Sequence, residues 1–430
     1  MKKVILGSII PLAMCLMLLV TGCGGGAAEN VVKIGVVGPM TFIQGEQHWY
    51  GATMAAEEIN AAGGIMIGDE AYDIQLFQVD SNEMLSPTDA ASAMERVLTV
   101  DKVDFVVGGF RTEGVFPMQE IAMENKTIFL GCGSATKALC DGVAEDYDKY
   151  KYWFRVTPVN DVYLFGVDME LLKMVADEVR DKCGIETPKV AILAEKLEWA
   201  ETIVTFANTL IPSEGMEVVG TWRPSDTATD VTAELTAIED AGANIIFTTI
   251  SGPMGIVYAK QWGETQVPAA SVGINVEAQK QGFWDATDGY GNYEMGLNTF
   301  AEGVKITDQT IPFFDTFVDR FGQFPTYNSG TYEALFILKD AIEAAGTLDS
   351  DAVVVELEKT DRTGTAGRIV FDGNHDVVWG PGYVTAVGIQ WRDGEMHAVW
   401  PPADGSWEGV AYEGVVDYEL PPWVIEALGP

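Results

Sequence analysis

Four side chains with the chemistry of an anion site follow apolar stretches in the first third of the 430-residue chain: Arg111, Thr112, Ser134 and Thr136. A guanidinium clamps a carboxylate through two parallel hydrogen bonds, and hydroxyl groups add further donors. The apolar stretches are typical of strands, and the residues after them of helix starts, where unpaired backbone N–H groups favour negative charge. An Arg111–Glu113 surface pair and simple helix caps at Ser134 and Thr136 are the structural alternatives. Both loops are therefore candidate contacts for a small carboxylate.

Histidine is the side chain most often used for proton transfer, and the chain has only three, His48, His375 and His397. None of them stands beside a GxSxG nucleophile motif, and the sequence contains neither HExxH nor a P-loop. The glycines of 35–38 lack the GxGxxG spacing of a dinucleotide site. A Ser/His/Asp triad assembled from distant residues stays open, but no motif supports an enzyme or a cofactor.

Alternating strand and helix patterns supply the scaffold that positions these loops. In a first unit, strands are predicted over 31–38, 74–80, 103–109 and 127–131, and helices over 49–62, 87–100 and 114–124. In a second unit, strands are predicted over 152–156, 189–193, 216–220, 244–249 and 270–273, and helices over 165–183, 199–211, 228–241 and 253–262. Two such units in succession predict two doubly wound parallel sheets. Further helices are expected over 312–320, 327–345 and 351–359, then antiparallel strands over 368–371 and 384–391, while the tail from Pro401 receives no element.

The N-terminus has the layout of a bacterial lipoprotein signal. Met1–Lys3 is positively charged, and the apolar residues 4–20 lead into a Thr-Gly-Cys end that resembles a lipobox. The resemblance implies a signal peptide over 1–22, acylation of Cys23 and a flexible tether over 23–30. An uncleaved N-terminal helix with a chance cysteine is the alternative. No other stretch is long and apolar enough to span a bilayer, so the lipid is expected to be the sole membrane attachment.

Strong acidity separates this chain from nucleic-acid-binding proteins. It has 26 Lys and Arg against 64 Asp and Glu, a formal charge of −38, and loss of Lys2 and Lys3 with the signal leaves −40. Nucleic acid is excluded as a partner, because phosphates attract a basic surface. With 47% hydrophobic and 10% aromatic residues the mature chain is globular, and its length favours two domains.

Three cysteines remain when Cys15 and Cys23 are set aside, namely Cys132, Cys140 and Cys183. An oxidising compartment permits a Cys132–Cys140 bridge, and buried free thiols are the alternative. The chain has no CxxC pair, so no motif supports a zinc or redox site.

Six segments, in their order and spacing behind the lipobox, carry a resemblance to a known family. They are Lys33–Thr41, Ala55–Ile65, Val106–Gly109, Gly131–Thr136, Phe154–Pro158 and Gly367–Asn374. From about 32 to 400 the chain resembles the type I periplasmic binding proteins of the branched-chain amino acid and amide ABC transporter group. The resemblance implies an α/β fold of two Rossmann-like, doubly wound parallel-sheet lobes joined by three crossovers. The implied division is an N-lobe over 31–157 and 290–366, a C-lobe over 158–289 and 367–400, and a C-terminal extension over 401–430.

The resemblance also implies a function. Proteins of this group are not enzymes and carry no cofactor. They capture a small-molecule ligand outside the cytoplasm and contact the permease of an importer that ATPase subunits drive. The chain is therefore expected in the cell envelope, at the periplasmic or outer surface. A lipid-anchored ligand sensor on the same fold and an envelope hydrolase are the competing interpretations.

Carried onto this sequence, the ligand site of the family falls on eight residues: Arg111, Thr112, Ser134, Ala135, Thr136, Trp199, Asn275 and Glu277. The residues of the N-lobe would hold a carboxylate, and Trp199 would close over the ligand from the C-lobe, with core packing as the alternative. Members that bind amino acids have an acid where this chain has Asn275. An amide, a urea-like compound or a carboxylate without an amine would suit Asn275, unless Glu277 serves the amine instead. Closure of the lobes over the ligand is the expected mechanism.

Overall fold

The first lobe is built on a six-stranded sheet in the order β2-β3-β1-β4-β5-β6. The computed structural model describes residues 30–430. The strands are β1 (Val31–Gly38), β2 (Ile65–Ile67), β3 (Glu70–Asp80), β4 (Phe105–Gly108), β5 (Phe129–Gly131) and β6 (Trp153–Arg155). All pairings are parallel except that of the edge strand β2 with β3. The central strand β1 is almost wholly apolar, as expected of a parallel strand that is covered on both faces.

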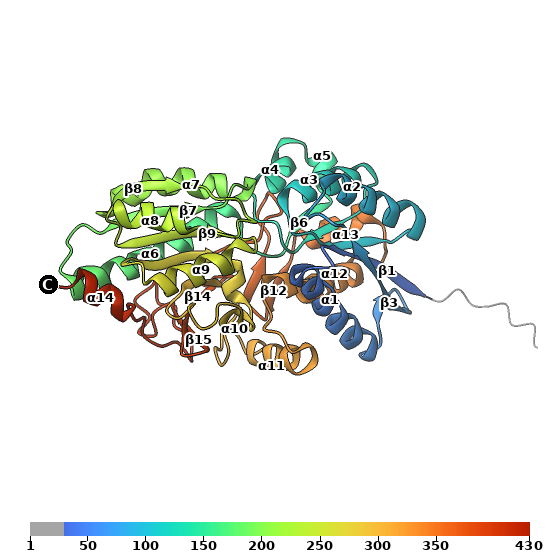
Figure 1. Ribbon diagram of the computed structural model, residues 1–430. Coiled ribbons are helices and arrows are strands. Elements are labelled where there is room, and N and C mark those ends of the chain that lie inside the picture. Colours follow the sequence, from blue (N-terminus) through green and yellow to red (C-terminus); the bar gives the residue numbers. More distant parts are fainter. Residues whose placement is uncertain (1–29) are drawn as a thin grey trace, which may run out of the picture.

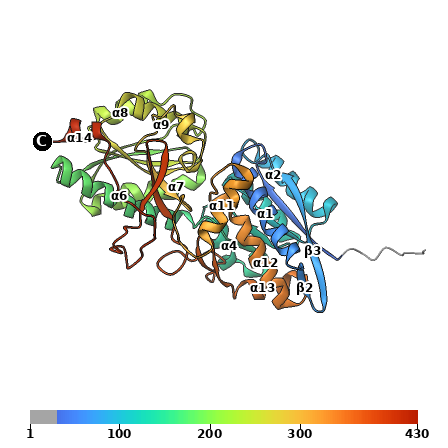
Figure 2. The same cartoon turned by 90° about the horizontal axis from the view of Figure 1, so that it is seen from below.

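Helices of the first lobe pack against this sheet and against one another. They are α1 (Ile43–Ala61), α2 (Pro87–Arg96), α3 (Thr112–Glu124), α4 (Ala138–Glu145), α5 (Tyr147–Tyr150), α11 (Thr310–Phe321), α12 (Thr331–Ala345) and α13 (Ser350–Leu357). Figure 2 shows α1, α12 and α13 grouped together, and α2 packs against α3. The start of α2 is encoded locally: Ser86 Oγ accepts a hydrogen bond from Asp89 N at 3.1 Å, and Pro87 occupies the first turn.

The second lobe is built on a four-stranded parallel sheet in the order β10-β9-β7-β8. Its strands are β7 (Lys189–Ala194), β8 (Glu217–Trp222), β9 (Ile245–Ile250) and β10 (Ala270–Asn275). Its helices are α6 (Asp161–Cys183), α7 (Glu198–Leu210), α8 (Thr232–Asp240), α9 (Met254–Thr265) and α10 (Phe283–Ala286). Asn160 caps α6 by accepting a bond from Tyr163 N at 2.9 Å, and Gly184 ends it in the left-handed conformation. The predicted succession of two doubly wound α/β units is confirmed (Figure 1).

An antiparallel three-stranded sheet, β11-β14-β15, extends the second lobe. The strands are β11 (Met295–Asn298), β14 (Val387–Arg392) and β15 (Glu395–Trp400). The division expected from the sequence placed 290–298 in the first lobe. Here β11 pairs with β14 and lies beside β10, so this part of the expected boundary is corrected by strand pairing over a long sequence separation. The hairpin of β12 (Asp361–Gly364) and β13 (Gly367–Val370) lies where the lobes meet (Figure 1).

The tail over 401–430, which the sequence left without an element, lies against the second lobe and ends in α14 (Pro422–Leu428). Trp423 Nε1 donates to Val267 O at 3.1 Å, and Gln390 Nε2 donates to Glu419 O at 2.7 Å. Leu420 is buried among the core residues of that lobe. The end of the tail therefore packs on the second lobe, whereas Tyr412 OH lies 2.5 Å from Oγ1 of Thr385, a residue that lines the cleft.

Several predicted boundaries differ from the observed ones. Helix α1 begins at Ile43 rather than at Trp49. Phe42 N donates to Pro39 O in a turn, and Glu46 N then donates to Phe42 O in the first hydrogen bond of the helix. The predicted strand 384–391 begins three residues later, at Val387, and strand β15 was not predicted. Strand β14 pairs with the distant strand β11, and β15 continues from β14 through a tight hairpin.

Candidate functional site

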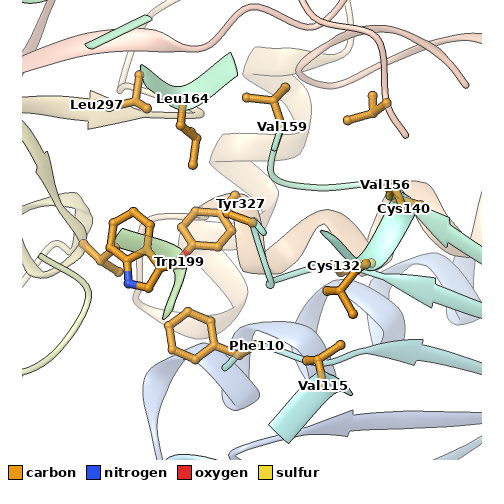
Figure 3. Packing of buried hydrophobic residues seen from close by; sticks show 14 of the residues in the cluster. Phe110, Val115, Cys132, Cys140, Val156, Val159, Leu164, Trp199, Leu297 and Tyr327 are labelled. Atoms are coloured by element: carbon orange, nitrogen blue, oxygen red, sulfur yellow. The ribbon is translucent and has the colours of Figure 1, made fainter. Parts of the chain in front are cut away.

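A cleft lies between the lobes, at the carboxyl ends of the strands of both sheets. It encloses about 1090 Å³ of space that no atom fills, including the part open to solvent. Its lining is mainly apolar and includes Phe110, Leu164, Trp199, Ile274, Leu297 and Tyr327. Figure 3 shows Phe110, Trp199 and Tyr327 gathered around one space, with Leu164 and Leu297 on another side of it. Parallel α/β sheets place ligand sites at this edge, so the cleft is the candidate site.

The loop after β4 brings Arg111 to the cleft, where its side chain forms an ion pair with a residue of the second lobe. Arg111 Nη2 lies 2.5 Å from Asp226 Oδ2, and Arg111 Nη1 donates to Met84 O at 2.8 Å. The pair with Glu113 that the sequence suggested is present at 3.7 Å. Glu113 also accepts a hydrogen bond from Glu198 N, at 3.2 Å, so two contacts join this loop to the second lobe. Asp226 was missed from the sequence because it lies 115 positions away from Arg111.

The loop after β5 leaves two backbone N–H groups, those of Ala135 and Thr136, without a protein acceptor in the part of the chain that the structure describes. Arg155 Nη1 donates to Ser134 O, and Asp161 N donates to Ala135 O at 2.8 Å. A trans peptide group points its C=O and N–H in opposite directions, and both peptide groups here are trans. The N–H groups of Ala135 and Thr136 therefore point away from Arg155 and Asp161. Within residues 30–430 they donate to no protein acceptor, and Ala135 lines the cleft.

The hydroxyl groups predicted for the site lie next to these N–H groups. Thr112 Oγ1 and Ser134 Oγ are 2.9 Å apart, so one hydroxyl donates to the other across the two loops. Thr112 also begins α3, whose first turn has no side-chain cap. The structure therefore brings Thr112, Ser134, Ala135 and Thr136 together at the end of the first sheet. Thr112 and Ala135 line the cleft, whereas Ser134 and Thr136 do not.

Arg155 holds the loop after β5 in place and was not singled out as functional from the sequence. Its side chain is fully buried. Besides Ser134 O it donates to Thr136 O at 2.6 Å and to Asp376 Oδ1 at 2.8 Å. Asp376 Oδ2 accepts a further bond from Asn160, the cap of α6, at 2.9 Å. One buried ion pair thus fixes the carbonyls of the loop and the start of the second lobe.

Trp199 projects into the cleft from the first turn of α7. Its Nε1 donates to Glu195 Oε1 at 2.8 Å, and Glu195 Oε2 accepts from Gly252 N at 2.9 Å. Ser251 Oγ donates to the same carboxylate. Burial raises the pKa of Glu195, and these hydrogen bonds oppose the rise. Glu195 therefore orients the indole ring, and its only signal in the sequence is its place directly after a strand.

Asn275 and Glu277 are not brought into the cleft lining. Asn275 Nδ2 donates to Gly255 O and to Glu294 Oε1, both at 3.1 Å, and its Oδ1 accepts from Glu277 N. A Cβ on Gly255 would lie 2.1 Å from Asn275 Oδ1, so glycine is needed there. Glu277 pairs with Lys280 at 2.5 Å. Contact of these two side chains with a ligand stays a prediction.

A buried acid supports the loop after β4 from behind. Glu83 Oε1 accepts a hydrogen bond from Phe110 N at 3.0 Å, and only 1% of the residue is exposed. Burial raises the pKa of Glu83 to about 8, although its hydrogen bonds and the charge of Arg111 oppose the rise. Gly114 leaves the room for this side chain, because a Cβ there would lie 2.6 Å from Glu83 Cβ. The carboxyl group is therefore neutral near pH 7.

The sequence leaves open a Cys132–Cys140 disulfide or buried free thiols, and the structure has the free thiols. Cys132, Cys140 and Cys183 are all unbridged and buried. Burial raises the pKa of Cys132 and of Cys140 to about 12, which keeps both groups as inert thiols. Trp153 Nε1 donates to Cys140 Sγ at 3.3 Å, so this thiol is part of the core.

Among residues 30–430, acidic, histidine and cysteine side chains form no group that could hold a metal ion. No helix in that range has the length and apolar character needed to cross a membrane. Cys23 and the predicted signal peptide and tether, up to Glu29, lie outside the described residues.

Comparisons with known proteins agree with this architecture. A family model described as periplasmic binding protein matches residues 31–395. The chain is 21% identical over 397 residues to "Leu/Ile/Val-binding protein homolog 7" of Brucella abortus (strain 2308), an alignment that covers 88% of this chain and 94% of the relative. A solved branched-chain amino acid transporter substrate-binding protein from Streptococcus pneumoniae, in complex with isoleucine, has a TM-score of 0.70 at 20% identity and covers 86% of this chain and 99% of its own. A solute-binding protein from R. palustris, in complex with benzoate, has a TM-score of 0.67 at 15% identity and covers 90% and 99%. The predicted two-lobed fold of type I periplasmic binding proteins is confirmed by this likeness.

The neutral state of Glu83 has a consequence for stability. The pKa of Glu83 is about 8 in the folded protein and near 4.5 in the unfolded chain. At a pH between these two values, unfolding therefore releases a proton. The contribution of Glu83 to stability should therefore fall as the pH rises from about 4.5 to about 8 and then level off. Glu83→Gln lacks this titrating group. The free energy of unfolding of the variant, relative to that of the wild type, should therefore increase as the pH rises from about 4.5 to about 8. Urea unfolding at pH 5, 7 and 8.5 measures it.

The exposed acid Glu302 provides the matched control, because Glu302→Gln removes the same charge at the surface. It should keep the pH dependence of the wild type. If Glu83→Gln follows the wild-type curve as well, Glu83 is ionised in the folded protein and the account of this loop is wrong.

Proposed function

This chain belongs to the periplasmic binding protein family, and on that premise we propose that it captures a small molecule between its lobes and delivers it to the permease of an ATP-driven importer. The proposed ligand is a carboxylate with an apolar body. The observation that carries this proposal is the pair of unpartnered N–H groups at Ala135 and Thr136, set beside an apolar cleft. A carboxylate docked there gains charge-assisted hydrogen bonds, and its apolar remainder is removed from water.

Five residues of the first lobe are proposed to form the docking surface: Arg111, Thr112, Ser134, Ala135 and Thr136. The backbone N–H groups and the two paired hydroxyl groups supply donors directly. Arg111 contributes positive charge, but its strongest partner is Asp226 of the second lobe. Arg111 therefore acts mainly on closure, since its ion pair with Asp226 forms only when the lobes are together.

The second lobe is proposed to close over the docked ligand with Trp199. Glu195 holds the indole ring in place, so closure costs little side-chain entropy there. The contact of Glu113 with Glu198 N joins the lobes a second time. In a protein of net charge −38 such contacts offset the mutual repulsion of two acidic lobes. The closed surface is what the permease would recognise.

The relatives support transport but leave the ligand open. Similar proteins are named for leucine, isoleucine and valine, and solved neighbours hold isoleucine or benzoate. Both ligands combine a carboxylate with an apolar body, which is the combination that this cleft fits. The proposal therefore includes branched aliphatic and aromatic carboxylates.

A thermal-shift screen of the chain from Glu29 onward, against amino acids, amides and carboxylates, tests ligand capture. A ligand at 100 times its Kd adds about 2.7 kcal/mol of stability, which raises Tm by several degrees. Trp199→Leu should weaken the binding of a hit by at least about tenfold, or about 1.4 kcal/mol, because the indole covers the ligand. Calorimetric titration measures that loss, and small-angle scattering of the wild type should report closure.

Trp284→Leu is the matched control, because this tryptophan packs beside Gly289 and Gly394 and does not line the cleft. It should bind the hit as the wild type does. A screen without any stabilising compound, or equal losses in the two variants, would contradict the proposed site.

Membrane attachment through Cys23 is a separate part of the proposal, and it rests on the lipobox-like sequence alone. In the expressing bacterium, Cys23→Ala should move the protein from the detergent phase of a phase-separation assay to the aqueous phase, because no acyl chain is attached. Cys15→Ala, within the same signal segment, should leave the partition unchanged. Retention of the Cys23 variant in the detergent phase would indicate an uncleaved helix instead.

A further inference from the structure

Gln279 carries an acceptor atom that nothing in the protein uses. It ends the 3-10 helix Val276–Gln279 that follows β10, lines the cleft, and is only 3% exposed. Its Nε2 donates to Leu297 O at 2.8 Å, and this bond fixes the plane of the amide. Among residues 30–430 its Oε1 has no hydrogen-bond partner. A buried acceptor without a partner destabilises a fold, so its presence at a ligand cleft marks a place for a donor on the ligand.

Two acids close to the cleft hold protein groups in place. Glu195 accepts from Trp199, Ser251 and Gly252. Glu277 pairs with Lys280 at 2.5 Å. An ammonium group would therefore find both of these carboxylates already paired.

Glu333, the acid among the residues that line the cleft, is occupied as well. Glu333 Oε1 accepts from Thr365 N at 2.6 Å, and Glu333 Oε2 lies 3.4 Å from Arg362 Nε. An ammonium group loses its hydration on entering an apolar cleft and needs an opposite charge to replace it. A neutral amide oxygen such as Gln279 Oε1 replaces one hydrogen bond but supplies no charge, so it suits a neutral donor.

We propose that Gln279 determines specificity, and that the ligand is an apolar carboxylate that carries a neutral donor, a hydroxyl or an amide N–H, in place of an α-ammonium group. This inference rests on the proposed function for the carboxylate end, which docks on the first lobe. The donor end faces the second lobe, where Gln279 Oε1 accepts from it. Closure then satisfies a buried acceptor that the free protein leaves without a protein partner.

Pairs of ligands that differ by one group test the two parts of the proposal separately: the absence of an ammonium group and the presence of a neutral donor. Calorimetry compares phenylalanine with 3-phenylpropanoate, and leucine with 4-methylpentanoate, to measure the effect of the ammonium group. It then compares 3-phenylpropanoate with its 3-hydroxyphenyl and 4-hydroxyphenyl forms to measure the effect of a neutral donor. Loss of the ammonium should strengthen binding at least tenfold, and a hydroxyl group in reach of Gln279 should add about threefold to tenfold.

Gln279→Met keeps an unbranched side chain of similar length and removes the acceptor. In this variant the gain from the hydroxyl group should vanish, while 3-phenylpropanoate itself stays within about threefold of its wild-type affinity. Gln44→Met is the control, because Gln44 is also buried with an unpartnered Oε1 but lies outside the cleft lining. It should retain the preference for the hydroxylated ligand.

The outcomes distinguish this inference from the function on which it rests. If no carboxylate binds, the proposed function fails. If phenylalanine or leucine binds more tightly than its deaminated partner, the protein is an amino-acid binder and the inference is overturned. If the hydroxylated ligands gain nothing, or keep their gain in Gln279→Met, then Gln279 Oε1 binds water only and does not set specificity.

Discussion

The buried guanidinium of Arg155 is the constraint on which the rest of the site depends. A charge without exposure to water must be fully paired, and Arg155 meets this need with Asp376 and with the carbonyls of Ser134 and Thr136. Because the Ser134 carbonyl turns inward, the N–H group of Ala135 turns outward. The N–H group of Thr136 is turned outward by the bond from Asp161 N to Ala135 O, at the start of the helix that Asn160 caps. The end of β5 thereby becomes a donor surface. The carboxylate of Asp376 also holds Asn160, which begins the first helix of the second lobe. The donor surface and the connection between the lobes are thus set by the same ion pair.

In the proposed account each lobe contacts a different part of the ligand. In the proposed site the first lobe offers backbone donors, and the second offers apolar side chains around Trp199 and the unpartnered acceptor Gln279 Oε1. Acids are present near the cleft, but each is used to position protein groups, as Glu195 positions Trp199. The ion pair of Arg111 with Asp226 then links the lobes directly at the edge of this space. Such an arrangement gives affinity through apolar burial and orientation through a few polar contacts.

Local patterns in the sequence predicted most of the scaffold but few of the contacts. The run of apolar residues in β1 and the cap at Ser86 act within a few positions, and the loops after β4 and β5 were predicted as the site from their place after strands. Contacts between distant residues escaped prediction, because no local pattern reports them. The pairing of β11 with β14 and of Arg111 with Asp226 are of this kind. Asn275 was chosen by position, but its side chain turns under α9 to Gly255, a direction that depends on the packing of that helix.

A crystal structure of the protein with a carboxylate ligand tests the central claim most directly. The account predicts that the ligand carboxylate lies at hydrogen-bond distance, about 2.7–3.2 Å, from the N–H nitrogens of Ala135 and Thr136, with its apolar body against Trp199. It also predicts that the bonds from Arg155 to the loop remain as they are in the structure described above. A ligand bound in the cleft with its carboxylate elsewhere, and with the N–H groups of Ala135 and Thr136 still unpaired, would contradict the account.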